Sequence, residues 1–157
     1  MNIPGPSLPP SLTLVTALCA AACSSSTAPD PALRAFVGVY ALASVDGTPL
    51  PVLQLDYSTT RQYLVGDTVT ADGTGHYSRV TVTRTDSVGK SYTAFSRQSV
   101  TGAYDVRADS VDLIVTCPPG ALCVNPPIGW LSTDGSFTLA YRFTTGFKFV
   151  SHYYRVR

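Results

Sequence analysis

SFTLAYRF, residues 136–143, is the stretch of this chain that decides its fold. Large apolar residues stand at every second position from Phe137, and polar or small residues stand between them. A period of two is that of a β-strand with one buried face. From Ala35 onward, other runs are rich in Val, Thr, Tyr and Phe, and no window shows a sustained apolar spacing of the helical kind. The predicted strands are residues 36–45, 62–70, 76–85, 91–100, 110–116, 136–143 and 147–156, with a further short one at 51–57.

Tight turns separate several of these runs. Asp-Gly pairs occur at residues 46–47, 72–73 and 134–135, and glycine accepts the positive φ that short hairpin turns require. Short strands joined in this way are typical of an all-β domain. We predict a single antiparallel up-and-down β-barrel of about eight strands, because closing the sheet leaves no exposed edge. A β-sandwich is the alternative.

The N-terminal region has a different composition. Residues 12–22 (LTLVTALCAAA) form an apolar stretch that ends at Cys23, and a Ser-, Pro- and Ala-rich segment follows at 24–33. Such a stretch is too short to cross a bilayer as a helix and suits the centre of a secretory leader. The small residues followed by Cys23 resemble the lipobox of bacterial lipoproteins. The start departs from the leader pattern, because residues 1–11 contain no Lys or Arg.

The lipobox resemblance implies export and a membrane anchor. Residues 1–22 would be a lipoprotein signal peptide, and Cys23 would carry a diacylglyceryl group and often an amide-linked acyl chain such as palmitate. Residues 23–34 would contain this cysteine and a flexible tether, and the folded domain would span residues 35–157. The expected location is the cell envelope, at the periplasmic or outer-membrane face, with the membrane as a partner. A soluble secreted protein in which Cys23 is incidental is the alternative.

Two later cysteines, Cys117 and Cys123, frame the sequence CPPGALC. An exported protein permits disulfides. A bond across this short loop would stabilise the fold by about 2 kcal/mol on the chain-entropy model. A redox pair normally has two intervening residues, and a metal site needs further Cys or His ligands nearby. The spacing therefore favours a structural disulfide over either alternative.

The start of the predicted domain carries a second resemblance. Gly38-Val39-Tyr40 lies in the first predicted strand and is similar to the Gly-x-Trp motif of lipocalins, with Tyr in place of Trp. In that family a basic side chain from the last strand covers the ring, and Arg155 stands near the end of the last predicted strand. The resemblance implies a lipocalin-like barrel in which Gly38, Tyr40 and Arg155 form a structural, barrel-closing motif. Residues 36–51 also resemble the opening of uncharacterised bacterial lipoproteins.

Composition and motifs argue against several functions. The formal net charge is +1 and there is no basic run, so we expect no nucleic-acid binding. Only His76 and His152 would act as bases near neutral pH, and there is no Gly-x-Ser-x-Gly nucleophile motif. Asp105, Asp109 and Asp112 cluster near a predicted turn without the spacing of a calcium loop. We therefore expect no enzyme activity, no catalytic residue, no cofactor and no metal site.

Aromatic residues remain as the basis for a binding function. They crowd the last two predicted strands, and inward rings of a wide barrel would line a pocket for a small apolar ligand. The candidate ligand-binding residues are Tyr141, Phe143 and Trp130, although such rings would simply fill the core of a narrow barrel. The Pro-rich loop at 117–130 would suit a protein contact instead. The sequence thus predicts an exported, lipid-anchored envelope protein that binds a small apolar ligand; a non-enzymatic protein-interaction module of the envelope is the alternative.

Overall fold

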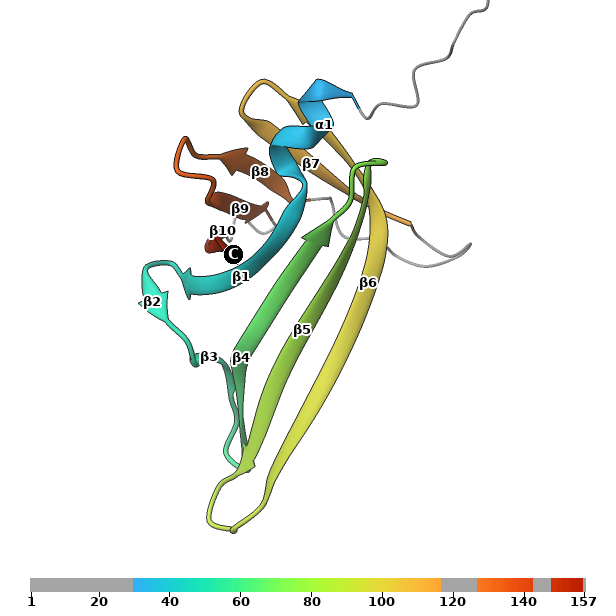
Figure 1. The fold of residues 1–157 in the computed structure, drawn as a ribbon. Coiled ribbons are helices and arrows are strands. Elements are labelled where there is room, and N and C mark those ends of the chain that lie inside the picture. The colour runs from blue at the N-terminus through green and yellow to red at the C-terminus, as the bar shows by residue number, and fades with distance from the viewer. Residues whose placement is uncertain (1–29, 117–126, 143–147, 157) are drawn as a thin grey trace, which may run out of the picture.

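A computed structural model describes residues 30–116, 127–142 and 148–156 of the chain. Within these ranges the chain forms one short helix and ten strands that hydrogen-bond into a single sheet (Figure 1). The elements are α1 (Pro31–Phe36), β1 (Gly38–Val45), β2 (Thr48–Pro49), β3 (Val52–Asp56), β4 (Thr60–Ala71), β5 (His76–Ser87), β6 (Thr93–Arg107), β7 (Ser110–Val115), β8 (Ile128–Leu131), β9 (Phe137–Arg142) and β10 (Lys148–Val156).

The sheet closes on itself because β1 has a partner on each side. β1 pairs with β10 along one side, and its residues 38–41 pair with residues 68–71 of β4 along the other. The ring β1-β4-β5-β6-β7-β8-β9-β10 contains eight antiparallel strands. The predicted up-and-down barrel is therefore confirmed, and the β-sandwich alternative is wrong. β2 and β3 are additional strands, paired with β1 and β4 respectively.

Turn chemistry fixes two of the connections that the sequence predicted. Asp46 and Gly47 join β1 to β2 with φ of 48° and 77°, the left-handed pair that a two-residue hairpin loop requires. Between β8 and β9, Gly135 has a φ of 81°, and the Asp134 carboxylate accepts a 2.9 Å hydrogen bond from the Ser136 amide. These local preferences set the register of the neighbouring strands.

The helix α1 covers one end of the barrel. Asp30 caps its N-terminus by accepting a 2.9 Å hydrogen bond from the Ala32 amide. Phe36 is fully buried in the core, and Leu33, three residues earlier on the same helix face, packs against that core. The sequence predicts a flexible tether as far as residue 34, but residues 31–34 belong to this helix. The difference arises because the helix has a capping residue and two apolar side chains to bury.

Two strand assignments also differ from the prediction. β8 lies at 128–131, inside and just beyond the segment expected to be a Pro-rich loop, and β6 continues to Arg107 instead of ending at residue 100. β8 is only four residues long and contains Gly129, so it offers almost no alternation to detect. Cys117 and Cys123, which lie in the remainder of that loop, fall outside the described residues, as does Cys23.

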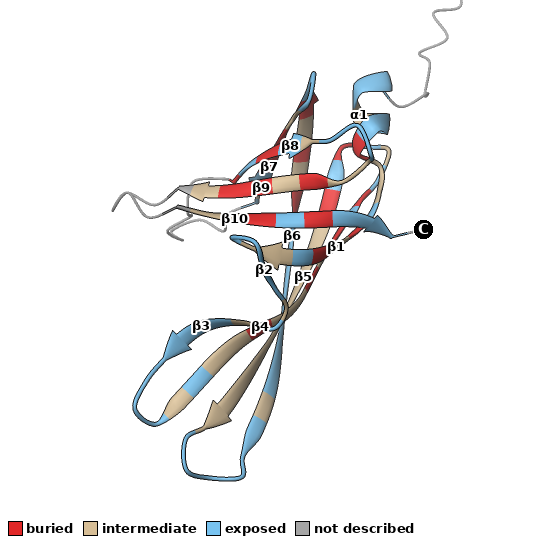
Figure 2. Ribbon diagram, turned by 90° about the vertical axis from the view of Figure 1, so that its left-hand side faces the viewer, coloured by how far each residue is buried: buried red, intermediate tan, exposed pale blue. Residues whose placement is uncertain are grey.

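The longest strands run past the barrel and form a second region. β4 pairs with β1 only from Thr68, and β6 pairs with β7 only from Gly102. The remaining parts extend beyond the ring, as the lower half of Figure 1 shows. We call them the projecting sheet: residues 52–56 of β3, 60–66 of β4, 80–87 of β5 and 93–101 of β6. Only Leu64 is buried there, whereas buried residues crowd the barrel (Figure 2).

Candidate functional site

The barrel interior is filled with aromatic rings at the end that α1 covers. Phe36 stacks on Tyr40 with a centroid distance of 4.9 Å, and Phe137 stacks on Tyr153 at 4.5 Å. Phe36 and Tyr40 both meet the Phe137 ring edge-on, at 5.0 and 4.8 Å. Each of these four side chains is at most 1% exposed. Aromatic pairs of this geometry contribute about 0.5–1.5 kcal/mol each beyond the burial of their area, so this end is a packed core.

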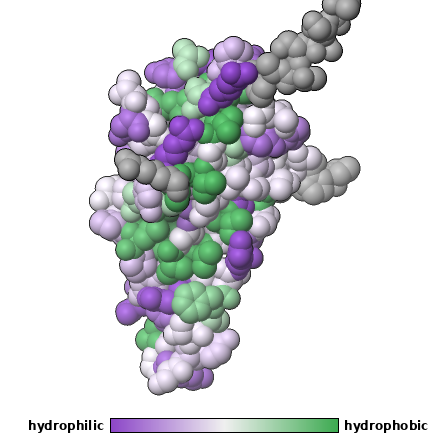
Figure 3. All heavy atoms as spheres, in the orientation of Figure 1, coloured by the Kyte–Doolittle hydropathy of each residue, from purple (hydrophilic) through white to green (hydrophobic). Residues whose placement is uncertain are grey.

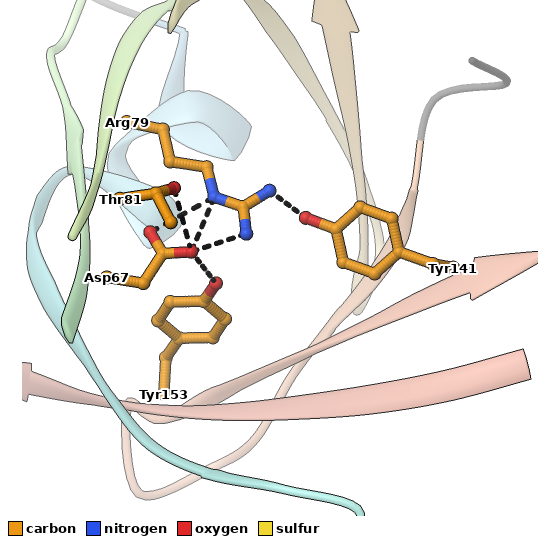
Figure 4. A network of polar contacts seen from close by, with 5 residues as sticks. All are labelled: Asp67, Arg79, Thr81, Tyr141 and Tyr153. Carbon is orange, nitrogen blue, oxygen red and sulfur yellow. Dashed lines mark hydrogen bonds and ion pairs between the residues drawn. The ribbon is translucent and has the colours of Figure 1, made fainter. Parts of the chain in front are cut away.

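A buried ion pair lies beside this core, inside the barrel wall (Figure 4). The Arg79 Nε donates to both carboxylate oxygens of Asp67, at 3.0 and 2.8 Å, and its Nη2 also contacts one of them. The Asp67 side chain is fully buried, whereas that of Arg79 is 22% exposed. The two residues come from neighbouring strands, where inward positions alternate with outward ones. Bidentate pairing satisfies a carboxylate that would otherwise be very costly to bury.

Two tyrosines and a threonine complete the network of Figure 4. The Tyr153 hydroxyl donates to Asp67 at 3.2 Å, Thr81 donates to the same oxygen at 3.4 Å, and Arg79 Nη1 donates to the Tyr141 hydroxyl. Burial raises the pKa of Tyr153 above its ordinary value, which keeps this phenol protonated as a donor. Burial alone would lower the pKa of Arg79, but its interactions with Tyr153 and Asp67 outweigh this effect and raise the pKa above its ordinary value. The guanidinium therefore stays charged. The network therefore satisfies the buried carboxylate of Asp67 and links three strands of the barrel.

Only one feature of the sequence points to this network. Asp67 stands two residues before Val69 and four before Ala71, both of which are buried on the same face of β4. A carboxylate in phase with buried apolar positions is the one signal of a buried partner. Nothing in the sequence says which arginine pairs with it, because that depends on the register between β4 and β5.

The structure places the three residues of the predicted closing motif together. Tyr40 and Arg155 are register partners on β1 and β10, and the guanidinium carbon lies 5.8 Å from the centre of the Tyr40 ring. Arg155 also donates to the Val37 carbonyl. Gly38 has a φ of 152°, and a Cβ there would lie 2.8 Å from the Arg155 Nε. Glycine therefore leaves the space in which Arg155 crosses from the last strand to the first.

The three predicted ligand-binding residues do not form one site. Tyr141 points into the barrel, stacks on Phe149 at 4.5 Å and packs against the core. Trp130 pairs with Thr138, which lies between the inward residues Phe137 and Leu139, so Trp130 is on the outer face of the wall and 38% exposed. Phe143 lies outside the described residues. Trp130 and Tyr141 therefore face opposite sides of the sheet.

A cavity opens where β1 and β4 separate to enclose the link through β2 and β3. Its volume is about 240 Å³, below the 300–1,000 Å³ typical of drug-sized ligand pockets. The lining is mainly apolar and consists of Val45, Asp46, Val52, Leu53, Gln54, Leu64 and Phe149. Phe149 links this cavity to Tyr141, the only one of the described predicted ligand residues that lies near it.

A second hollow of about 310 Å³ lies on the outer surface, next to the turn between β4 and β5. It contains Asp72 and His76, but both already serve the turn. The Asp72 carboxylate accepts hydrogen bonds from the hydroxyl and amide of Thr74 and from the His76 amide, and these bonds lower the pKa of Asp72. His76 Nδ1 lies 3.0 Å from the Thr74 hydroxyl. Among the described residues that line it, the hollow therefore shows no free acid–base pair.

The projecting sheet carries apolar and aromatic side chains on its outer face. Leu53, Tyr63, Arg84 and Phe95 are successive register partners on β3, β4, β5 and β6, and we call them the outer row. The Arg84 guanidinium lies over the Tyr63 ring at 4.6 Å, while Phe95 is 68% exposed and Leu53 46%. In Figure 3, hydrophobic side chains gather over the level of β3 and β4, beside hydrophilic ones. Exposed aromatic residues so arranged are typical of protein-contact surfaces.

Charges on the projecting sheet are mostly paired. Asp56 bonds to Arg61 at 3.1 Å and Asp86 bonds to Arg84 at 3.1 Å. Arg97 and Lys90 make no ion pair with any residue that the structure describes. Arg97 of β6 and Lys90 of the turn before it therefore give this part of the projecting sheet a small excess of positive charge.

Within residues 30–116, 127–142 and 148–156, no three His, Cys, Asp or Glu side chains gather into a possible metal site. None of the helices in those ranges has the length and hydropathy to cross a membrane. Comparisons of the chain with protein-family models, with curated proteins and with solved structures found no match.

Proposed function

We propose that this protein is an exported, lipid-anchored protein of the cell envelope that uses the projecting sheet to bind another envelope protein, without catalysis. The anchor is the lipid on Cys23, and α1 connects the anchored segment to one end of the barrel. The barrel acts as a rigid stand, and the sheet extends from it (Figure 1).

The observation that carries this proposal is the distribution of apolar side chains. At the covered end of the barrel the rings pack against each other and the interior is filled. On the projecting sheet and its connecting turns, large apolar side chains are exposed instead, by between 38% and 68%. They are Leu53, Leu55, Tyr57, Val88, Tyr92, Phe95 and Val100, whereas the most exposed of those on the outer barrel wall, Tyr154, reaches 53%. Exposed apolar groups in one region are costly in water and are typical of an interface that is covered in the complex.

Site-specific photocross-linking in the native host tests the partner. A photoreactive phenylalanine analogue replaces Leu53 of the outer row, and the matched control replaces Tyr154, which is 53% exposed on the barrel wall. We expect a discrete cross-linked product from the Leu53 position alone, with a mass different from that of two linked copies of the processed, lipid-bearing chain. Equal products from both positions, or none from Leu53, would contradict the proposal.

Metabolic labelling with a fatty-acid probe tests the anchor separately. The wild-type chain should incorporate the probe and fractionate with membranes, and the Cys23→Ala variant should do neither. Cys19→Ala, which alters the other cysteine of the leader region, is the matched control and should label normally. Labelling that persists in the Cys23→Ala variant would contradict the proposed lipid anchor on Cys23. The proposed protein contact would then be tested by the cross-linking experiment alone.

The apolar cavity between β1 and β3 favours a small apolar ligand as the second candidate function. It is lined by Val52, Leu64 and Phe149 among others, and one carboxylate, Asp46, lies at its edge. Native mass spectrometry of protein purified from its own host should then show a bound small molecule. Val52→Trp, which would fill the cavity, should abolish that adduct, and an adduct that persists in this variant would place the ligand elsewhere.

A further inference from the structure

The outer edge of β6 is open over residues 93–101. β5 pairs with β6 on one side along the whole of this segment. On the other side β7 pairs only with residues 102–107, and no strand among the described residues pairs with 93–101. Figure 1 shows this part of β6, in yellow, along the margin of the projecting sheet. An edge of this length exposes a row of backbone N–H and C=O groups that another strand satisfies well.

We propose that the open edge of β6 pairs antiparallel with the same edge of a second copy of this chain, across a two-fold axis at Ser96. The two projecting sheets then form one continuous sheet, β3-β4-β5-β6 of one copy followed by β6-β5-β4-β3 of the other. Closed two-fold contacts of this kind, in which one surface patch meets itself, are the commonest form of oligomer. The proposal does not depend on the partner protein proposed above, because it uses the edge of β6 and covers only Phe95 among the exposed apolar side chains of the outer row.

The sequence TAFSRQS at residues 93–99 decides the register. With Ser96 on the axis, Phe95 of each copy lies opposite Arg97 of the other, and Ala94 lies opposite Gln98. Directly opposed side chains in an antiparallel pair are about 4.5–5.5 Å apart at Cβ, which brings the Arg97 guanidinium over the Phe95 ring. Both side chains are exposed in the single copy, so both are available for this contact.

This contact continues a pattern already present within one copy. On the outer row, the Arg84 guanidinium covers the Tyr63 ring at 4.6 Å, and Phe95 is the next residue across the sheet. The second copy adds its Arg97 beyond Phe95. Aromatic and cationic side chains then alternate across the junction, as Tyr63, Arg84, Phe95 and the second copy's arginine.

Other registers fit less well. An axis at Arg97 would place the two Arg97 side chains directly opposite each other, and like charges so placed are destabilising. An axis at Phe95 shortens the paired segment to residues 93–97, because the residues before Thr93 belong to the turn that precedes β6. An axis at Gln98 leaves Phe95 opposite Thr101, next to β7, with no cation to meet its ring. The axis at Ser96 pairs residues 93–99 fully and avoids like-charge contacts directly across the pair.

Cysteine cross-linking tests the register directly. Opposed Cα atoms in an antiparallel pair are about 4.5–5.5 Å apart, within the range that a disulfide spans. Ser96→Cys should therefore give a cross-linked dimer on mild oxidation of the full chain, with the linked peptide identified by mass spectrometry. Gln98→Cys is the matched control, since two copies of that position would lie four residues apart, about 13 Å along the strands. Cross-linking of Gln98→Cys equal to that of Ser96→Cys would overturn the proposal.

Sedimentation equilibrium of the full chain in mild detergent tests the association. A junction of this size is small, so we expect a dissociation constant on the order of micromolar or weaker. Each dimer has two Phe95–Arg97 contacts, and Phe95→Ser or Arg97→Ser should weaken it by roughly 5- to 30-fold. Tyr154→Ser removes a ring that is 53% exposed on the barrel wall and should leave the constant unchanged. A wild-type chain that stays monomeric up to about 500 µM would overturn the proposal.

Discussion

The barrel and the projecting sheet are built from the same strands and differ in what those strands bury. In the barrel, β5 and β6 contribute Tyr77, Tyr104 and Val106 to a dry core. In the projecting sheet the same two strands bury none of the residues 80–87 and 93–101. There, order comes from backbone pairing and cross-strand contacts such as Arg84 on Tyr63. Stability therefore belongs to the barrel, and the projecting sheet is free to carry surface chemistry.

Truncating one phenylalanine in each region should lower the free energy of unfolding by very different amounts. Phe137 is 1% exposed and contacts Phe36, Tyr40 and Tyr153, so Phe137→Ala should cost about 3–5 kcal/mol of unfolding free energy. Phe95 is 68% exposed, and Phe95→Ala should change stability by less than about 0.5 kcal/mol. Urea denaturation followed by circular dichroism, at a concentration where the chain is monomeric, measures both. Similar losses for the two variants would erase the proposed contrast.

Removing the cation from the buried network should have the next largest effect. Arg79→Met leaves the fully buried Asp67 carboxylate without its main partner, which should destabilise the barrel by about 2–4 kcal/mol, the partial exposure of Arg79 lowering the value. Arg61→Met removes an ion pair whose two side chains are half exposed on the projecting sheet, and its effect on stability should be small beside that of Arg79→Met.

The double variant Asp67→Leu with Arg79→Met separates the two possible causes. Because it removes the stranded carboxylate as well, it should recover part of the loss seen in Arg79→Met. A double variant that is less stable by the sum of the two single changes would show that packing around Arg79, rather than its charge, is what matters.

Closure of the barrel between its first and last strands should respond to the size of residue 38. Gly38→Ala would place a Cβ 2.8 Å from the Arg155 Nε at a φ of 152°, and we expect a loss of about 1–3 kcal/mol. Gly89→Ala is the matched control, since that glycine also has a positive φ but meets no atom within 4 Å of its Cβ position. If Gly38→Ala and Gly89→Ala lost the same unfolding free energy, backbone strain alone would explain both losses. That result would contradict the role assigned to Arg155.

The two regions also differed in how far they could be predicted. Alternation at 136–143 and the Asp-Gly turns predict strands and hairpins, because both depend on neighbouring residues alone. The inward direction of Tyr141 follows from the same period. β4, β5 and β6 extend beyond the barrel because their pairing with β1 and β7 stops partway along the strands. No local sequence pattern predicts where that pairing stops. Asp30-Pro31 was a usable signal for α1, since both residue types favour a helix start.

Alkaline pH should weaken the barrel through Tyr153. Burial raises the pKa of this phenol in the folded state above its ordinary value of 10.0, so the folded protein holds the proton more tightly than the unfolded chain. The corresponding stability is fully present below about pH 10 and is lost as the pH rises above it. Tyr153→Phe should lose about 1–2 kcal/mol at pH 7, because Asp67 loses a donor, and should show a shallower decline above pH 10.

Tyr92→Phe on the projecting sheet's turn provides the comparison for this pH effect. Tyr92 is 61% exposed, and its replacement should leave both the stability at pH 7 and the alkaline decline as in the wild type. Stability curves measured by urea denaturation between pH 7 and 11 give both quantities. An unchanged slope in Tyr153→Phe would assign the alkaline decline to the other buried tyrosines, Tyr40, Tyr77 and Tyr104, whose pKa values burial also raises.

The smallest effect on stability should come from replacing Trp130. This experiment also tests whether the residue lies on the outer face of the barrel wall. This residue is the only tryptophan of the chain, so its fluorescence reports on one position. Because Trp130 is 38% exposed on the outer face of β8, acrylamide should quench it readily in the folded state, and Trp130→Phe should cost less than about 0.5 kcal/mol. A ring tucked into the barrel mouth would be shielded from the quencher and costly to replace. The two measurements together therefore decide on which side of the barrel wall the indole lies.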